Sequence, residues 1–453
     1  MKFKEFLEMT ISFKSTTQFK IERLELVLNS SQRISIDALF SELNLYDNLF
    51  TPCVSGNILI IDTLALVDQL KLNGDEKIYI RISKDEDQEG FRYEKEFVIY
   101  SLTNKTNLNI TSTAYVLNFV SKEFLKSLQK KINQNYVGSF TDIVYKILTG
   151  SNYLNVAEEP PQNGQSGVGV FLQSENLQDL IFPTLTPFDA INFASQKATY
   201  RNTPDFLFFE THKTGYNFLP LTYLLQQQNV FEINFKPKNL SNSATANQEE
   251  FLGARDLKVL SQFSVLDGVQ GGVYAGRFVG FDTLTKTTKV TTIISNKNLS
   301  DEKNKRYNEM TESRVVSYPF ALPRTAVEYI KGNDPETYGI IDRTENYIYQ
   351  RKAIFTNLMQ QRLQLVMPGN FELFSSRNIF LKVPKFSTQL GDDALDRSLT
   401  GKYIITGTRH IIRPNRHETI IEVCAAKLLG LKNNQPGTEN FFSTFAEKDI
   451  YAF

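Results

Sequence analysis

The segment 44–82 decides the fold class and reads NLYDNLFTPCVSGNILIIDTLALVDQLKLNGDEKIYIRI. Within it, 57–62 (NILIID) is an apolar run of strand length, and isoleucine recurs at every second position of 78–82 (IYIRI). A period of two turns one face toward a core and the other toward water, which is typical of a half-buried β-strand. Gly74 lies between Asn and Asp and marks a turn before the second strand. The segment therefore predicts antiparallel β structure.

The same pattern extends outward over the first hundred residues, at 24–28 and 97–100. Several short strands separated by turn residues are typical of an antiparallel barrel or sandwich. We place this first unit, a β-barrel, at 1–117.

A mixed α+β block follows at 118–235. Helical periodicity predicts helices at 119–131 and 140–148, the second with Gly150 as its stop. A third helix is expected at 186–198, with Thr186 as N-cap and Pro187 in the first turn. Two short apolar runs around the turn 212–215 predict a β-hairpin.

Strand patterns return after residue 232 and are interrupted by a polar stretch. The predicted strands are 232–235, 257–266, 274–281, 287–294, 363–367, 379–383, 402–412 and 418–424. A helix is expected at 344–361. We interpret 236–292 together with 363–430 as a second β-barrel that carries a partly helical insertion at 293–362, and 431–453 as a C-terminal extension. The predicted class is mainly β, with two antiparallel barrels separated by the mixed block.

Composition excludes several classes of protein. The chain of 453 residues has 50 Lys+Arg and 50 Asp+Glu, so it is not built to grip bulk nucleic acid or an anionic membrane. Two cysteines and three histidines offer neither a disulfide framework nor a zinc module. The start, MKFKEFLEMT, is no signal sequence, and no apolar run is long enough to span a bilayer. We expect a soluble product that is made in a cytoplasm and is prone to self-association.

One near-match to a metal site occurs at 85–96. Asp85, Asp87, Glu89, Gly90 and Glu96 follow the order of an EF-hand calcium loop, but position five is Glu and the flanks alternate as strands. An EF-hand needs helices on both sides. We favour a solvated hairpin turn and keep a bound calcium ion as the alternative.

Two glycine patterns resemble functional motifs but are better explained by structural roles of glycine. Gly272, Gly276 and Gly280 repeat every four residues like a membrane-helix packing motif, but strand-like residues between them favour bulges or close packing in a barrel. The stretch 164–169 (GQSGVG) matches neither a nucleophile elbow nor a phosphate loop, and it is interpreted as a flexible loop.

The remaining candidates are a basic stretch and the cysteines. Residues 409–417 (RHIIRPNRH) could touch nucleic acid, but we favour a strand–turn–strand whose charges are solvated or face a charged partner. His410 and His417 straddle this turn without a further ligand at metal-binding spacing. Cys424 is expected to be buried and inert, and Cys53 has no basic neighbour that would activate it. The sequence therefore predicts no catalytic, cofactor-binding or metal-binding residue, and no enzyme.

The segment 44–82 resembles the first barrel of the central baseplate hub proteins of contractile-tailed phages of the T-even type. The residues that carry this resemblance are Tyr46, Asp47, Leu49, Phe50, Gly56, Asp62, Gly74 and Glu76. Further segments are similar in the same order, namely 119–148 with Thr141, Asp142, Ile143 and Val144, then 185–198, 206–210, 272–286 and 400–423. The stretch 295–362 and the C-terminal tail have no clear counterpart.

The resemblance implies a structural part of a virion tail. Hubs of this family form homotrimers, whose two barrels per subunit convert threefold spike symmetry into the sixfold symmetry of the tube around a channel. The implied partners are the tail tube or its initiator, the central spike, baseplate wedge proteins and the tape measure protein. DNA would transit the lumen without sequence-specific binding, and no membrane anchor is implied. Assembly would occur in the host cytoplasm. On this hypothesis the 35 Phe and 20 Tyr partly serve subunit interfaces.

Alternatives of other classes stay open. The related spike hub of a type VI secretion-like machine usually continues into a long β-helical spike. A tail-associated cell-wall hydrolase needs paired carboxylates or a Cys/His centre in a separate module, and no stretch is free to be one. A carbohydrate-binding tail protein is disfavoured by the absence of Trp.

Overall fold

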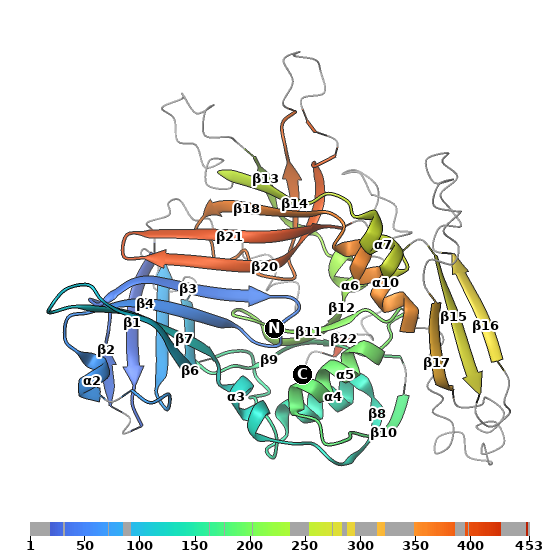
Figure 1. The fold of residues 1–453 in the computed structure, drawn as a ribbon, viewed down its shortest axis with the longest axis horizontal. Helices are drawn as coiled ribbons and strands as arrows, with labels where there is room; N and C mark the ends of the chain where they lie inside the picture. The colour runs from blue at the N-terminus through green and yellow to red at the C-terminus, as the bar shows by residue number, and fades with distance from the viewer. Residues whose placement is uncertain are drawn as a thin grey trace.

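The computed structural model describes most of the chain (Figure 1). The described residues are 19–29, 32–70, 72–84, 92–162, 164–175, 177–201, 203–235, 253–273, 275–282, 288–294, 315–321, 348–385, 395–396, 398–426 and 450–451.

The N-terminal part is a run of antiparallel strands that surrounds its own apolar core. Its elements are β1 (Phe19–Val27), β2 (Arg33–Ser35), β3 (Phe40–Asn48), β4 (Ser55–Asp62), the short helix α2 (Leu66–Leu70), β5 (Lys77–Lys84), β6 (Arg92–Asn107) and β7 (Thr113–Ser121). The predicted inward face is confirmed, because Ile78, Ile80 and Ile82 are fully buried, but Tyr79 on the opposite face is also buried, at 7% exposed. The three isoleucine side chains share one core with Leu43, Ile58 and others.

Residues that carry the family resemblance have structural roles in this part. A Cβ on Gly56 would lie 2.4 Å from the ring of Phe119, so only glycine fits in β4. Asp62 accepts hydrogen bonds from the backbone N–H groups of Leu64 and Leu66 and so holds the start of α2. Glu76 accepts from the N–H groups of Asn73 and Gly74 at the turn into β5. Each of these residues fixes a local backbone geometry.

The C-terminal strands join this sheet directly. They are β13 (Asn229–Asn234), β14 (Asp256–Ser261), β18 (Arg362–Pro368), β19 (Asn378–Lys382), β20 (Gly401–Arg413) and β21 (Arg416–Ala425). β20 pairs antiparallel with β3, with Arg409 opposite Tyr46. The result is one sheet of thirteen strands, in which the main path runs β14-β18-β21-β20-β3-β4-β7-β6-β5-β1-β2 and β19 pairs with both β20 and β13.

A mixed α+β block packs beside this sheet. It contains α3 (Lys122–Gln129), β8 (Asn135–Ser139), α4 (Phe140–Thr149), β9 (Val168–Leu172), β10 (Leu177–Ile181), α5 (Pro187–Lys197), β11 (Phe206–Thr211), β12 (Gly215–Pro220) and α6 (Leu221–Gln226). β22 (Ile450–Tyr451) pairs with β9, so the last described residues of the chain complete a four-stranded sheet, β11-β12-β9-β22. β8 and β10 form a separate pair.

Local sequence signals set the helix starts in this block. Ser139 and Asp142 form a capping box at α4, and the Thr186 side chain accepts from the N–H of Asp189 at α5. Pro187 occupies the first turn of α5, where its missing N–H costs nothing. The predicted helices at 140–148 and 186–198 are therefore confirmed.

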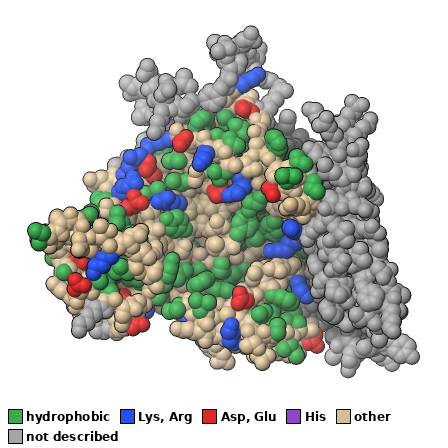
Figure 2. Space-filling model, viewed as in Figure 1, with side chains coloured by type: hydrophobic (Ala, Val, Ile, Leu, Met, Phe, Trp, Pro, Cys, Tyr) green, Lys and Arg blue, Asp and Glu red, His purple; other side chains and the backbone are tan. Residues whose placement is uncertain are grey.

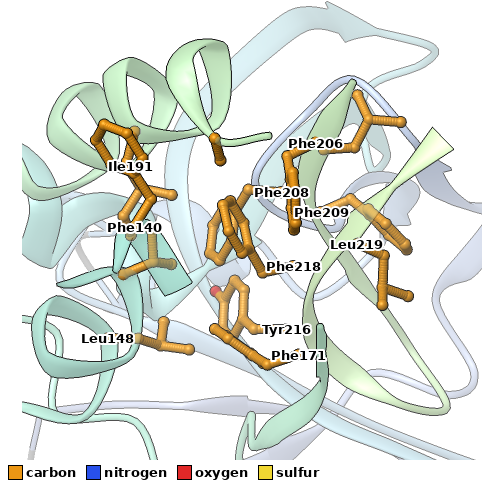
Figure 3. Close-up of a cluster of buried hydrophobic side chains, with 14 of the residues drawn as sticks. Phe140, Leu148, Phe171, Ile191, Phe206, Phe208, Phe209, Tyr216, Phe218 and Leu219 are labelled. Carbon is orange, nitrogen blue, oxygen red and sulfur yellow. The ribbon is translucent and has the colours of Figure 1, made fainter. Parts of the chain in front are cut away.

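The hairpin β11–β12 is the centre of the mixed block. All six residues of each strand are buried. Figure 3 shows its aromatic side chains gathered between the helices and the sheet, with Phe206 and Phe218 stacked at 4.7 Å and Phe208 and Tyr216 at 5.6 Å between ring centroids. Much of the aromatic content of the chain thus serves this core.

The remaining elements are α7 (Val265–Gly271), β15 (Ala275–Asp282), β16 (Thr288–Ile294), β17 (Val315–Ala321) and α10 (Ile348–Leu358). The predicted strand at 257–266 was too long, because β14 ends at Ser261 and the Ser264 side chain caps a helix that sequence analysis missed. Gly272 has φ 74° and ends α7 in the left-handed conformation, so it is a helix cap and not a barrel bulge. β15, β16 and β17 form their own three-stranded sheet at the side of the molecule (Figure 1).

The predicted mainly β, antiparallel class is confirmed. The two predicted barrels, however, are joined through β3 and β20, and the main strand path is open at β14 and β2 among the described residues. β15 and β16, which we had assigned to the second barrel, pair instead with β17. The limits of the domains stay a prediction.

Candidate functional site

A buried ion pair connects the mixed block to the N-terminal strands. Glu210 of β11 faces Lys95 of β6, and both side chains are almost fully buried. The second carboxylate oxygen of Glu210 accepts hydrogen bonds from the N–H of Val54, at 3.0 Å, and from the Ser121 hydroxyl, at 2.6 Å. Burying a charge is tolerated only when a counter-charge and hydrogen bonds replace water, and Glu210 has both. This cluster is a joint between four segments of the chain.

Next to this joint lies a group of buried polar side chains. Glu123 of α3 accepts hydrogen bonds from the hydroxyls of Ser166, at 3.1 Å, and Tyr216, at 3.4 Å. Burial, together with the nearby Glu210 charge, raises the pKa of the Glu123 carboxyl. Cys53 lies 3.4 Å from the Tyr216 hydroxyl, and burial raises the pKa of its thiol well above the usual value.

This group has the residue types of a catalytic centre without the access that catalysis requires. Glu123 and Lys95 are 1% and 5% exposed, and Cys53 is 6% exposed. A thiol with a raised pKa stays protonated at neutral pH and is a poor nucleophile. The arrangement can therefore fasten segments together, but its polar atoms are closed to a substrate.

All three histidines of the chain meet at a second buried joint. Nδ1 of His410 lies 3.1 Å from the Thr419 hydroxyl and 3.3 Å from Nε2 of His417. His212, from the β11–β12 turn, contacts His410 with ring centroids 6.0 Å apart. The sequence placed His410 and His417 around one turn, and the fold adds the third histidine from a distant segment.

Charged side chains border this histidine cluster. Asp47 of β3 lies 3.8 Å from Nδ1 of His212, and its other oxygen accepts hydrogen bonds from Ser375. Glu372 is paired with Lys213 at 2.5 Å and with Arg377 at 3.2 Å. These joints were not predicted from the sequence because their members are far apart in the chain. The available signal was an acidic residue inside an apolar strand, as in FLFFE (206–210) and NLYDN (44–48).

The calcium-loop candidate falls mainly outside the described residues. Of its five residues only Glu96 is described, and its carboxylate pairs with Lys77 at 2.9 Å across β5 and β6. The structure therefore gives Glu96 a role in strand pairing. Among described residues no group of three or more His, Cys, Asp or Glu is arranged to hold a metal ion.

The loop 164–169 proves more ordered than predicted. Val168 and Gly169 already belong to β9, and Ser166 is buried against Glu123. A Cβ on Gly169 would lie 2.4 Å from the carbonyl oxygen of Thr214, so glycine allows the neighbouring backbone to approach closely.

The basic stretch 409–417 has the predicted strand–turn–strand form, as β20 and β21. Arg413 binds Glu42 at 2.8 Å, and Arg409 donates to the side-chain oxygen of Asn44 at 2.9 Å. Figure 2 shows basic and acidic side chains interspersed over one face of the molecule. The charges are thus compensated within the sheet. Cys424 is fully buried in β21 as predicted, and burial raises the pKa of its thiol to about 11.

An exposed apolar patch marks the β14 edge of the large sheet. Val259, Leu260, Phe263 and Leu266 are 41%, 37%, 77% and 78% exposed. Among the described residues, β14 has a hydrogen-bonded neighbour on one side only, β18. An edge strand next to exposed apolar side chains is typical of a surface that binds another protein chain. No helix in the described part of the chain is long and apolar enough to cross a membrane.

Comparison with solved structures identifies the fold. The 43 kDa tail protein of prophage MuSo2 from Shewanella oneidensis matches with a TM-score of 0.50 and 5% identity, over 89% of this chain and 98% of that chain. The chain has the fold of a phage tail protein. The predicted resemblance is therefore confirmed at the level of the fold, despite the low identity.

Two further structures are similar. The tail protein from Neisseria meningitidis MC58 matches with a TM-score of 0.48 and 8% identity, over 90% of this chain and 97% of that chain. The E. coli c3393 protein, described as a type VI secretion component similar to the T4 tail proteins gp27 and gp5, matches with a TM-score of 0.38 and 10% identity, over 89% and 76% of the two chains. No protein-family model and no curated protein matches the sequence.

Proposed function

We propose that this protein is a structural baseplate hub of a contractile phage tail and has no enzymatic activity. The observation that carries the proposal is the shared fold with a prophage tail protein over nearly the full length of both chains. In this role three copies form a ring with pseudo-sixfold symmetry. The ring joins the tail tube, or its initiator, to the central spike and encloses the DNA channel, with wedge and tape measure proteins as further partners. The protein is then a virion component assembled in the host cytoplasm.

The open sheet edge supports self-association. β14 lies at one end of the strand path and β2 at the other, so one chain offers two different edges. Contacts between different surfaces of identical copies close into a ring when the rotation permits. We propose that the patch of Val259, Leu260, Phe263 and Leu266 is covered by a second copy in that ring.

The closed polar clusters support the non-enzymatic part of the proposal. Lys95, Glu123 and Glu210 resemble catalytic groups in type only, because their atoms are directed at one another inside the protein. Their role is to hold the segments of the subunit in a fixed relation.

Light scattering on the purified full chain tests the trimer. The expected mass is about three times 51.9 kDa. A monomer at micromolar concentration that degrades peptidoglycan would contradict the proposal and support the hydrolase alternative. Immunogold labelling of purified particles separates the remaining alternative: label at the tail ends of virions supports a phage hub, whereas virions without label favour the hub of a secretion-like machine.

A further inference from the structure

The histidine cluster joins three parts of the molecule that are distant in sequence. His212 comes from the β11–β12 turn of the mixed block, Asp47 from β3 of the N-terminal strands, and His410 and His417 from the β20–β21 hairpin. Phe371 lies between them, with ring centroids 4.7 Å from His410 and 4.5 Å from His417. Loosening this cluster would loosen all three parts together.

The imidazoles of His410 and His417 are buried away from water. His410 and His417 are each 2% exposed. A Cβ on Gly369 would lie 2.1 Å from Cγ of His417, so the ring packs directly on the backbone. Nε2 of His410 has no hydrogen-bond partner among the described residues. A second proton on either ring would therefore add a buried charge beside another imidazole.

The charged groups around the cluster do not neutralise His410 and His417. The described titratable groups that border it are Asp47 on β3, Tyr93 on β6, Lys213 after β11, and Glu372 and Arg377 in the segment before β19. The acidic groups among them have other partners: Asp47 binds Ser375 and faces His212, and Glu372 binds Lys213 and Arg377. From β1, the neighbour of His417 is the apolar ring of Phe19.

We propose that the His212–His410–His417 cluster is an acid-sensitive joint, which holds the β11–β12 turn against the β20–β21 hairpin while the imidazoles of His410 and His417 are neutral and releases it when these two are protonated. This goes beyond the hub function and does not depend on it.

The direction of the pH effect follows from burial. Desolvation, with a further contribution from the neighbouring imidazoles, lowers the pKa of His410 well below its usual value, and desolvation lowers the pKa of His417 to about 3. An unfolded histidine has a pKa near 6.5, so the open form takes up protons first as pH falls. The stability contributed by the neutral cluster is complete above about pH 6.5 and is lost progressively below it, down to about pH 3 for His417.

The first test uses the wild-type protein. Because the chain has only three histidines, deuterium exchange at each imidazole carbon can be followed by mass spectrometry from pH 8 to pH 4. We expect His410 and His417 to show no titration near pH 6.5 while the protein is folded. Ordinary titration of both residues at that pH would overturn the proposal.

The second test asks where the protein opens. Amide exchange at pH 7 and pH 4.5 should show loss of protection first in 212–214, 369–377 and 408–419, while 57–62 stays protected. Uniform loss of protection would indicate global acid unfolding and contradict a local joint.

Variants separate the histidines from the carboxylates. Between pH 6 and pH 4, the unfolding constant of the wild type rises as pH falls. In the double variant His410→Gln/His417→Gln this rise should be smaller by a factor of up to about 100 per pH unit, because two protons fewer are taken up on opening. Because an unfolded glutamate has a pKa near 4.3, the control Glu372→Gln should keep the wild-type slope between pH 6 and about pH 5. Equal slopes for the wild type and the double variant would refute the proposal. If the double variant does not fold, the two wild-type measurements decide alone.

Discussion

Lys95 and Glu210 lie 115 positions apart in the sequence and meet as an ion pair whose side chains are 7% and 1% exposed. One partner belongs to the N-terminal strands and the other to the buried hairpin of the mixed block. The pair therefore couples the packing of two parts of the chain, together with the hydrogen bonds from Val54 and Ser121 to Glu210.

Removing one member of this pair should be more harmful than removing both. Glu210→Ala leaves a buried ammonium group unpaired and should lower the free energy of unfolding by about 3–5 kcal/mol, measured by urea denaturation. Lys95→Met/Glu210→Gln should recover part of that loss. Arg33→Ala, at the exposed pair with Glu25, is the control and should cost less than about 1 kcal/mol. Similar losses for Glu210→Ala and Arg33→Ala would contradict the assigned role.

The packing of Gly369 on His417 should not tolerate a methyl group. Gly369→Ala is expected to lower the free energy of unfolding by about 1–3 kcal/mol, because a Cβ there collides with the imidazole ring. Gly407→Ala is the matched control in β20, where the nearest atom to a Cβ is 3.3 Å away on the side chain of Asn48. Thermal unfolding followed by circular dichroism compares the two. Equal melting temperatures would argue against close packing at His417.

Charges in the apolar patch should prevent self-association without unfolding the subunit. Phe263→Asp/Leu266→Lys places charges on side chains that are 77% and 78% exposed, so the fold should be unaffected. We expect the mass by light scattering to fall from three chains to one. Ile110→Asp, on a fully exposed side chain at the β6–β7 turn, should leave the trimer intact. A trimer that survives the patch substitutions would place the contact elsewhere.

The thiols of Cys53 and Cys424 should be unreactive in the folded protein. Burial raises the pKa of both Cys53 and Cys424, so we expect no reaction with Ellman's reagent at pH 8 within minutes. In guanidinium chloride two thiols per chain should react. Rapid reaction of Cys53 in the native protein would mean that the cluster around Tyr216 is open to solvent.

Local signals in the sequence predicted the elements that they specify, and long-range contacts had to come from the structure. Thr186 and Pro187 defined the start of α5, and the alternation in 78–82 defined β5. The run 257–266 was misassigned because its apolar residues suit a strand, whereas the Ser264 cap begins α7 within it.

For the buried joints the local signal is limited to an acidic residue inside an apolar strand, and it does not identify the partner. Nothing within ten residues of Glu210 identifies Lys95 as its partner, and His212 lies almost two hundred positions from His410. The pairing that joins the N-terminal and C-terminal strands into one sheet was also not predicted, because β3 and β20 carry no mark that they pair with each other.

The pairing of β3 with β20 delays completion of the large sheet during synthesis of the chain. Arg409 binds Asn44 across 365 positions. At ribosomal rates, β20 is therefore synthesised roughly 20 to 70 s after β3. During that time one edge of the N-terminal sheet is available to the wrong partner, including β20 from another nascent chain. Folding of the large sheet can therefore finish only once β20 has been synthesised, and expression at lower temperature or with chaperones should raise the yield of assembled protein.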